Sequence, residues 1–295
     1  MLLSTQTAVL EAKFGYEKAI KILADAGYDA YDMSFFHPVS ENDPLYSGDF
    51  REYAKALREH ADKSGIICNQ AHAPFPTSKG DEAKDKAILS SVLRAVEAAS
   101  ILGAKNIVVH PKQHMPYREN AELLKRINIE FYKSLIPYCE KFNINIAVEN
   151  MWQMNPVGNN TIVDSTCSRV EEFCEYIDEI GSDRIVACLD IGHVSLYGEN
   201  MSVIIRGLGK RIKALHVHDT DGYRDLHTLP FTANNDFPAI MKLLAEIGYE
   251  GDLTFEADSF FRNFPLSMYQ DVAEFMQKTG RCLIKMFEEE KRKLS

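Results

Sequence analysis

The chain has 295 residues, of which 45% are hydrophobic and 26% are charged, and its formal net charge is −10. This composition is close to the average of globular proteins and excludes a disordered chain, a collagen and a membrane bundle. No stretch of about 18 apolar residues is present, and no basic region precedes the short apolar run at the start, so we expect neither a membrane span nor a signal peptide.

Charge and cysteine usage indicate the compartment and exclude some partners. An acidic surface disfavours nucleic acid and anionic membranes as partners, although it does not exclude a local basic groove. The six cysteines form no CxxC pair and are too sparse for a disulfide framework. The sequence therefore predicts a cytoplasmic protein with reduced thiols and no membrane partner, and it disfavours a nucleic-acid partner.

Eight short runs rich in β-forming residues recur along the chain. Most are nearly continuous apolar stretches, as expected of parallel strands that are covered on both faces. We predict strands over 2–5, 28–34, 66–71, 106–110, 144–149, 185–190, 212–218 and 252–256.

Amphipathic stretches separate these runs, and several end at a glycine, which favours a helix end. Pro137 predicts a kink in the helix over 118–141, and Ser168 with Glu171 predicts a capping box for the helix over 168–180. The predicted helices cover 15–26, 49–64, 81–102, 118–141, 168–180, 200–209, 236–247 and 265–290.

Strict alternation of strands and helices fits two α/β architectures, a doubly wound sheet and a closed barrel. Eight units in fewer than 300 residues, with no GxGxxG motif after any strand, favour the barrel. We therefore predict one (β/α)8 TIM barrel over residues 1–295, which the helical segment 265–295 closes.

Catalytic residues of such barrels lie at the C-terminal ends of the strands. Six consecutive predicted strands deliver a His, Asp or Glu there: His72, His110, Glu149, Asp190, His216 and Glu256. Any one of them is explained by a structural hydrogen bond, but buried carboxylates are costly unless paired or bound to metal. Six such residues at equivalent strand ends together predict a metal site. Carboxylates with imidazole suit Mn, Co, Mg or Zn.

A second polar group follows strand seven in the segment DTDGYRDLHTLPF. Asp225 and His227 stand two residues apart, so their side chains point the same way if the loop is extended. They either add metal ligands, hold a substrate hydroxyl or belong to an ordinary polar loop.

At these motifs the chain resembles the xylose isomerase-like TIM barrel superfamily, specifically its sugar phosphate isomerase/epimerase branch, over about residues 15–275. The motifs are VEN at 148–150, LDIGH at 189–193, LHVHD at 215–219 and FEAD at 255–258. The resemblance implies one divalent ion held by Glu149, Asp190, His216 and Glu256. It also implies that the two glutamates are the acid/base pair and that His193 contacts substrate.

Endonuclease IV belongs to the same superfamily and holds three zinc ions. The resemblance implies that its additional ligands are matched here by His72, His110, His193, Asp225 and His227. We therefore expect one ion and leave room for up to three. A zinc-dependent phosphodiesterase acting on abasic DNA is the alternative function, although the net charge and the isolated rim cations weigh against it. Those cations are Lys79, Lys112, Arg118, Arg224 and Arg262.

The predicted function is a divalent-metal-dependent isomerase or epimerase of a sugar or sugar phosphate. Glu149 and Glu256 would exchange protons with substrate through an enediolate, and which of them abstracts the proton is open. Trp152 either stacks on the sugar or packs within its loop, while Lys112 and Arg224 are candidate phosphate ligands. A dehydratase or lyase acting on a sugar or polyol is a further alternative, a binding-only protein is disfavoured by the two glutamates, and a homo-oligomer is left open.

Overall fold

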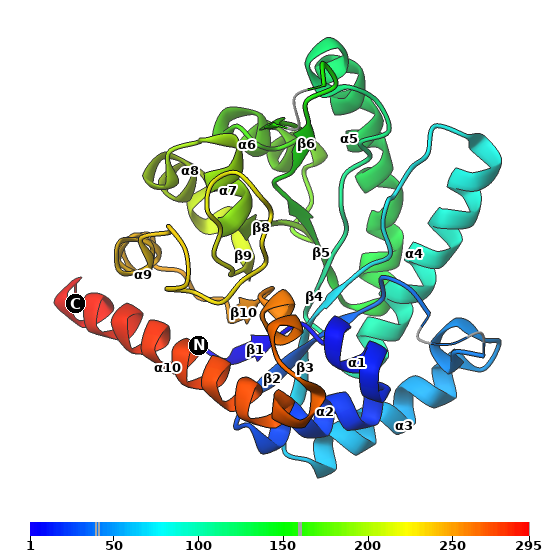
Figure 1. The fold of residues 1–295 in the computed structure, drawn as a ribbon. Coiled ribbons are helices and arrows are strands. Elements are labelled where there is room, and N and C mark those ends of the chain that lie inside the picture. The colour runs from blue at the N-terminus through cyan, green and yellow to red at the C-terminus, as the bar shows by residue number, and fades with distance from the viewer. Residues whose placement is uncertain (39, 41, 159–160, 295) are drawn as a thin grey trace.

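The structure, a computed structural model, describes residues 1–38, 40, 42–158 and 161–294. Eight parallel strands occupy the centre, and helices surround them (Figure 1). This arrangement confirms the predicted (β/α)8 TIM barrel. Each predicted strand range overlaps one of the eight: β1 Leu3–Thr5, β2 Ala30–Ser34, β3 Ile67–His72, β4 Asn106–Val108, β5 Asn145–Glu149, β8 Ile185–Asp190, β9 Ile212–His216 and β10 Leu253–Phe255.

Two sets of hydrogen-bonded strands make up the barrel. One runs in the order β2-β3-β4-β5-β8-β9, and the other pairs β1 with β10, all in parallel. Single bridges between Gln6 and Asp32 and between Val217 and Phe255 join the two sets. The barrel is therefore closed, and the C-terminal ends of all eight strands meet on one rim.

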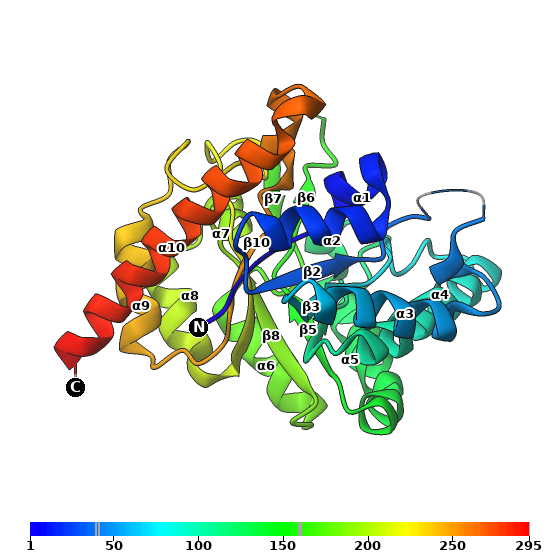
Figure 2. The ribbon, with the colours of Figure 1, turned by 90° about the horizontal axis from the view of Figure 1, so that it is seen from below.

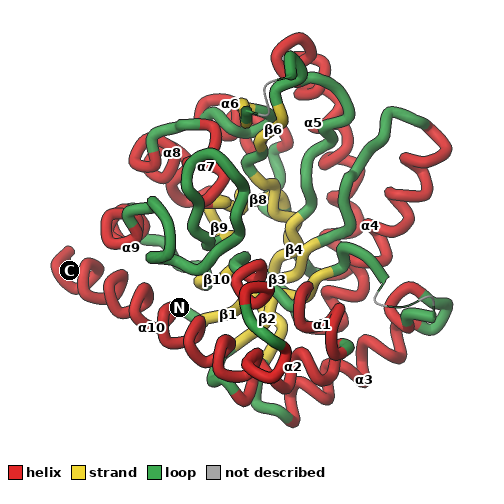
Figure 3. Tube along the Cα trace, viewed as in Figure 1, coloured by secondary structure: helices red, strands yellow, loops and turns green. Residues whose placement is uncertain are grey.

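Eight predicted helices are present and form the outer ring, as Figure 3 shows. The last of them packs against its neighbours α9 and α2 and runs across the outside of the barrel (Figure 2). Ser295, at the end of the predicted closing segment, lies outside the described residues. The helices are α2 Tyr16–Asp25, α3 Phe50–Lys63, α4 Glu82–Leu102, α5 Tyr117–Phe142, α6 Val170–Ile180, α8 Met201–Leu208, α9 Phe237–Glu246 and α10 Tyr269–Leu294.

Two details of the helix predictions are wrong. The backbone of α5 departs from helical geometry at Asn120 and not at Pro137, which lies on the exposed face, where water can bond the carbonyl that proline leaves free. The capping box is absent because α6 begins at Val170, after Ser168. Glu172 reaches back instead, and its carboxylate accepts a hydrogen bond of 2.8 Å from the Cys167 amide.

Short elements near the rim were not predicted. They include the helices α1 Ala8–Phe14 and α7 Ile191–Tyr197, and an antiparallel hairpin of β6 Trp152–Met154 and β7 Ile162–Asp164. Each is too short to show a period in the sequence. Four 3-10 turns complete the fold: η1 Pro44–Tyr46, η2 Gly209–Arg211, η3 Asp258–Asn263 and η4 Leu266–Met268. Among the described helices, none combines the length and the apolar character that crossing a membrane requires.

Candidate metal and catalytic site

Strand alternation places the polar side chains of the rim directly above a small apolar core. Residues two apart on a strand share a face, and Glu149, Asp190 and His216 each follow a core residue by two positions. All three side chains therefore point into the barrel. The core beneath them consists of Val108, Ala147, Val186, Cys188 and Ala214.

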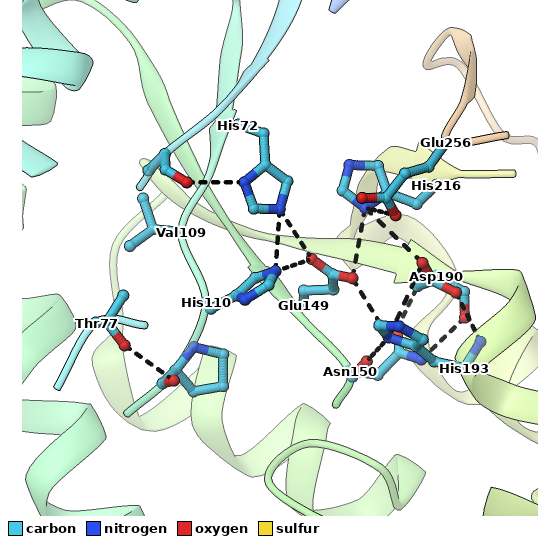
Figure 4. A network of polar contacts seen from close by, with 12 residues as sticks. His72, Thr77, Val109, His110, Glu149, Asn150, Asp190, His193, His216 and Glu256 are labelled. Carbon is cyan, nitrogen blue, oxygen red and sulfur yellow. Dashed lines mark hydrogen bonds and ion pairs between the residues drawn. The ribbon is translucent and has the colours of Figure 1, made fainter. Parts of the chain in front are cut away.

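The central group consists of Glu149, Asp190, His216 and Glu256, whose ligand atoms all lie within 4.8 Å of one another (Figure 4). The Nδ1 atom of His216 lies 3.0 Å from Oε2 of Glu256 and 3.4 Å from Oε1 of Glu149. It lies 3.9 Å from Oδ2 of Asp190. All four side chains are buried, and they come from four different strand ends.

Among the described residues, Nδ1 of His216 and Oε2 of Glu256 face each other without a hydrogen-bond partner, although both are buried. Oε2 of Glu149, on the side of His110, is buried without one as well. Buried polar atoms are almost always paired, so unpaired atoms that converge need an explanation. A bound cation provides one, since lone pairs would then point at a common centre. Three carboxylates and one imidazole suit a divalent ion such as Mn, Co, Mg or Zn. The residues present therefore fit the expected metal.

The protein keeps the two glutamates ionised despite their burial. Burial alone would raise the pKa of Glu149, but the neighbouring imidazoles of His216 and His110 hold it well below its usual range. Burial would likewise raise the pKa of Glu256, but the neighbouring imidazoles of His216 and His227 lower it well below its usual range. Both carboxylates are thus available as ligands or bases.

A second group shares Glu149 with the first. Its Oε2 atom lies 3.0 Å from Nε2 of His110 and 3.7 Å from Nε2 of His72. Nδ1 of His72 donates a hydrogen bond of 2.9 Å to the carbonyl of Ala73, so its Nε2 lone pair faces the group. Three potential ligands therefore meet at this position.

A third group lies closer to the mouth and contains His193, His218, Asp225 and His227. Asp225 Oδ2 lies 3.0 Å from Nε2 of His227 and 3.5 Å from Nε2 of His193. Burial opposes a charge on His193, but Asp190 and Asp225 raise its pKa to about 10. The predicted neighbours Asp225 and His227 thus do come together with His193.

His218 was given no role by the sequence analysis, although its spacing of two from His216 signalled a shared strand face. Its Nε2 atom lies 3.1 and 3.2 Å from the two carboxylate oxygens of Asp190. Its ring stacks on His227 with centroids 4.4 Å apart. The ring fits because Gly192 has no Cβ, which would lie 1.9 Å from Cε1 of His218.

Asn150 is a second residue that the sequence analysis left without a role. Its side-chain oxygen accepts a hydrogen bond from the Asp190 amide, and its side-chain nitrogen donates to the Asp190 carbonyl and to the Tyr197 hydroxyl. The Asn150 carbonyl accepts a hydrogen bond of 2.8 Å from Nδ1 of His193. Asn150 therefore ties β5 to β8 directly beside the ligands.

These groups open into a cavity of about 670 Å³. Its walls include Phe36, Phe75 and Trp152, whose indole nitrogen donates a hydrogen bond of 3.2 Å to Asp225. Arg262 is the one Lys or Arg among the described residues that line it. Most predicted site residues line it as well, whereas Asp190 and His216 lie beneath its surface. The lining members are His72, His110, Glu149, Trp152, His193, Asp225, His227 and Glu256.

Two predicted substrate ligands are not brought to this cavity. The ammonium group of Lys112 lies over the ring of Phe131, 5.0 Å from its centroid. Arg224 is largely exposed and forms an ion pair of 2.6 Å with Asp221. A role of Lys112 or Arg224 in binding substrate stays a prediction without support from their positions.

Residues 20–279 match the family described as the xylose isomerase-like TIM barrel. L-ribulose 3-epimerase of Methylomonas sp. is 25% identical over 83% of this chain and 79% of its own length. A probable endonuclease 4 of Oceanobacillus iheyensis is 26% identical over 59% of each chain. The solved structure of the IOLI protein with a binding zinc atom is 20% identical, covers 98% of this chain and 99% of its own, and has a TM-score of 0.71.

Proposed function

Because the chain belongs to the xylose isomerase-like TIM barrel family, as its motifs predict, we propose that it is a divalent-metal-dependent isomerase or epimerase of a sugar. The observation that carries this proposal is the pair of buried glutamates that meet at one ligand. Glu149 from β5 and Glu256 after β10 both approach Nδ1 of His216, at 3.4 and 3.0 Å. The similarity to L-ribulose 3-epimerase supports it.

In this proposal Glu149, Asp190, His216 and Glu256 hold the ion. Once bound, such an ion would act as a Lewis acid that stabilises the negative charge developing on a substrate oxygen. His218 and Asn150 keep Asp190 in place through the hydrogen bonds described above.

The two glutamates divide the proton transfer. One carboxylate takes the proton from the carbon beside the carbonyl group, and the other returns a proton to the opposite face or to the neighbouring carbon. The lowered pKa values favour the ionised form that the base needs. The glutamate that returns a proton must take one up before it acts as the acid. The geometry is equally suited to either direction, so we assign the pair and not the order.

The substrate is proposed to be a small carbohydrate, free or phosphorylated. A cavity of about 670 Å³ lies within the usual range for small-molecule sites. His193 and Trp152 lie on its wall, where they would contact hydroxyl groups and an apolar sugar face. We also propose a cytoplasmic location, because all six cysteines are free thiols and four of them are buried.

Exchange of substrate hydrogen with solvent tests the chemistry without knowledge of the exact sugar. The protein, loaded with Mn or Co, is incubated in D2O with L-ribulose, D-psicose, D-tagatose, D-fructose and the phosphates of these ketoses. We expect deuterium next to the carbonyl group of at least one, detected by NMR, and the epimer or isomer by chromatography. A product that has lost one water molecule relative to the substrate would instead indicate a dehydratase.

Matched variants assign the exchange to the site. Glu149→Gln and Glu256→Gln should each keep the fold and lose at least about 10²–10⁴-fold in rate. Glu172→Gln is the control, because Glu172 is a glutamate of α6 that does not line the cavity. No exchange with any of these sugars, in a protein shown to bind the metal, would overturn the proposal.

A second candidate, a zinc-dependent phosphodiesterase, is favoured by one specific observation. The groups around His110 and Asp225 add two potential metal positions to the central one, and the probable endonuclease 4 is a relative. Elemental mass spectrometry distinguishes the candidates. About one ion per chain supports the isomerase, whereas two or three zinc ions together with cleavage of abasic-site DNA would support the phosphodiesterase.

A further inference from the structure

A buried carboxylate lies on the far side of His216 from the central group. Asp32 occupies the middle of β2, is fully buried and points into the barrel. Gln70, its register partner on β3, donates a hydrogen bond of 3.0 Å from Nε2 to Oδ2 of Asp32. The same amide donates to the carbonyl of Leu215 at 3.4 Å. Gln70 therefore fixes Asp32 next to the residue that precedes His216.

The two nitrogens of His216 face different partners. Nδ1 points to the ligand carboxylates, whereas Nε2 lies 3.8 Å from Oδ2 of Asp32. Neither Nε2 of His216 nor Oδ1 of Asp32 has a hydrogen-bond partner in the described part of the chain, although both are buried. The ring of His72, stacked on His216 at 5.4 Å, limits its rotation. Nε2 of His216 thus faces a buried carboxylate without a hydrogen bond to it, and that carboxylate keeps one oxygen, Oδ1, unpaired among the described residues.

We infer that Asp32 is a positioning residue that orients His216 as a metal ligand by accepting a hydrogen bond from its Nε2. A neutral imidazole that offers the Nδ1 lone pair to a cation must carry its proton on Nε2. That buried N–H then needs an acceptor, and a shift of about 0.9 Å brings Oδ2 of Asp32 to the usual distance. Metal-ligating histidines usually donate their other N–H to such a partner.

The inference rests on the proposed role of His216 as a ligand and not on the identity of the sugar. The test is Co(II) binding. It is measured by equilibrium titration and monitored through the visible absorption bands of the bound ion. Asp32→Asn keeps the shape of the side chain and removes its charge, and Gln70→Met removes the amide that fixes Asp32. Loss of an outer partner typically weakens metal binding about 10–100-fold. We expect a loss in this range and altered Co(II) bands for Asp32→Asn, and a smaller loss for Gln70→Met.

Asp29→Asn is the matched control, because Asp29 lies just before β2 and pairs with Arg281 at 2.6 Å. It should lower stability without changing Co(II) affinity or the bands. Nitrogen-15 NMR of the zinc-loaded native protein adds a measurement that needs no variant: His216 should be ligated through Nδ1 and protonated at Nε2.

Ligation through Nε2, or native Co(II) affinity and bands in folded Asp32→Asn, would overturn the role of Asp32. Absence of Co(II) binding in the native protein would instead overturn the proposed metal-dependent function. The two failures are therefore distinguishable.

Discussion

Replacing Gly192 with alanine should disturb the candidate site far more than one methyl group suggests. The added carbon would lie 1.9 Å from Cε1 and 2.3 Å from Nε2 of His218. Carbon atoms pack at about 3.5–4.0 Å, so the imidazole would have to move by roughly 1.5–2 Å. Such a movement breaks its contacts with the Asp190 carboxylate, at 3.1 and 3.2 Å, and its stack on His227.

The expected cost in the free energy of unfolding combines three effects. Overpacking of a buried site costs about 1–3 kcal/mol, and losing a hydrogen bond to a charged group costs about 1.5–3 kcal/mol. Alanine in place of glycine within α7 returns at most about 1 kcal/mol. The net destabilisation of Gly192→Ala is therefore roughly 1.5–6 kcal/mol. Because Asp190 loses an orienting partner, metal affinity should also fall by about 10–100-fold.

Urea unfolding and a Mn or Co titration check this reasoning. Gly48→Ala is the control, since no atom of the described neighbouring residues lies within 4 Å of the position that its methyl group would occupy and its backbone is not left-handed. In the double variant Gly192→Ala/His218→Ala the smaller side chain removes the clash, so its destabilisation should be less than the sum of the two single changes. Native stability and native metal affinity in Gly192→Ala would refute the argument.

The remaining predictions concern pH, metal and substrate charge. Burial raises the pKa of Glu11 from 4.5 to about 8, so between these values the unfolded state loses a proton that the folded state keeps, and stability falls with rising pH by at most about 1.4 kcal/mol per unit. Glu11→Gln should flatten this slope in urea unfolding between pH 5 and 8, and an unchanged slope would contradict the raised pKa. Removing the metal with a chelator should lower the melting temperature, since an ion at a hundredfold excess over its Kd stabilises the protein by about 2.7 kcal/mol; identical melting curves would count against a site in the folded protein. Arg262→Gln should raise KM for a phosphorylated sugar more than for the free sugar, because Arg262 is the described cation of the cavity wall, and equal changes in KM would argue against a contact with phosphate.

Much of the site followed from the sequence because it depends on strand ends. Glu149, Asp190 and His216 terminate apolar runs, and parallel strands in a closed barrel carry their C-terminal ends to one rim. The topology thus brings these residues together whatever the details of packing. The family resemblance then supplied the predicted roles of these residues as metal ligands or as acid and base, which strand position alone leaves open.

What the sequence alone could not decide depends on which side chains become partners in the folded protein. Arg224 has the right charge for a phosphate, but Asp221, three residues away, forms an ion pair with it outside the cavity. The site contribution of His218 depends on the missing side chain of Gly192, 26 positions earlier. The contact of Gly192 with His218 leaves no period or motif in the sequence, and the spacing of Asp221 and Arg224 does not show on which side of the cavity wall their pair lies.

Glu149 connects the number of bound ions with the chemistry that the site can perform. Its Oε1 atom faces His216 in the central group, while Oε2 faces His110 and His72 in the second. With an ion at the central position alone, Oε2 stays available as a base. With ions at both positions, both oxygens would serve as ligands, and the Glu149 carboxylate would be a weaker base. Metal stoichiometry therefore separates proton-transfer chemistry from hydrolysis at this one residue.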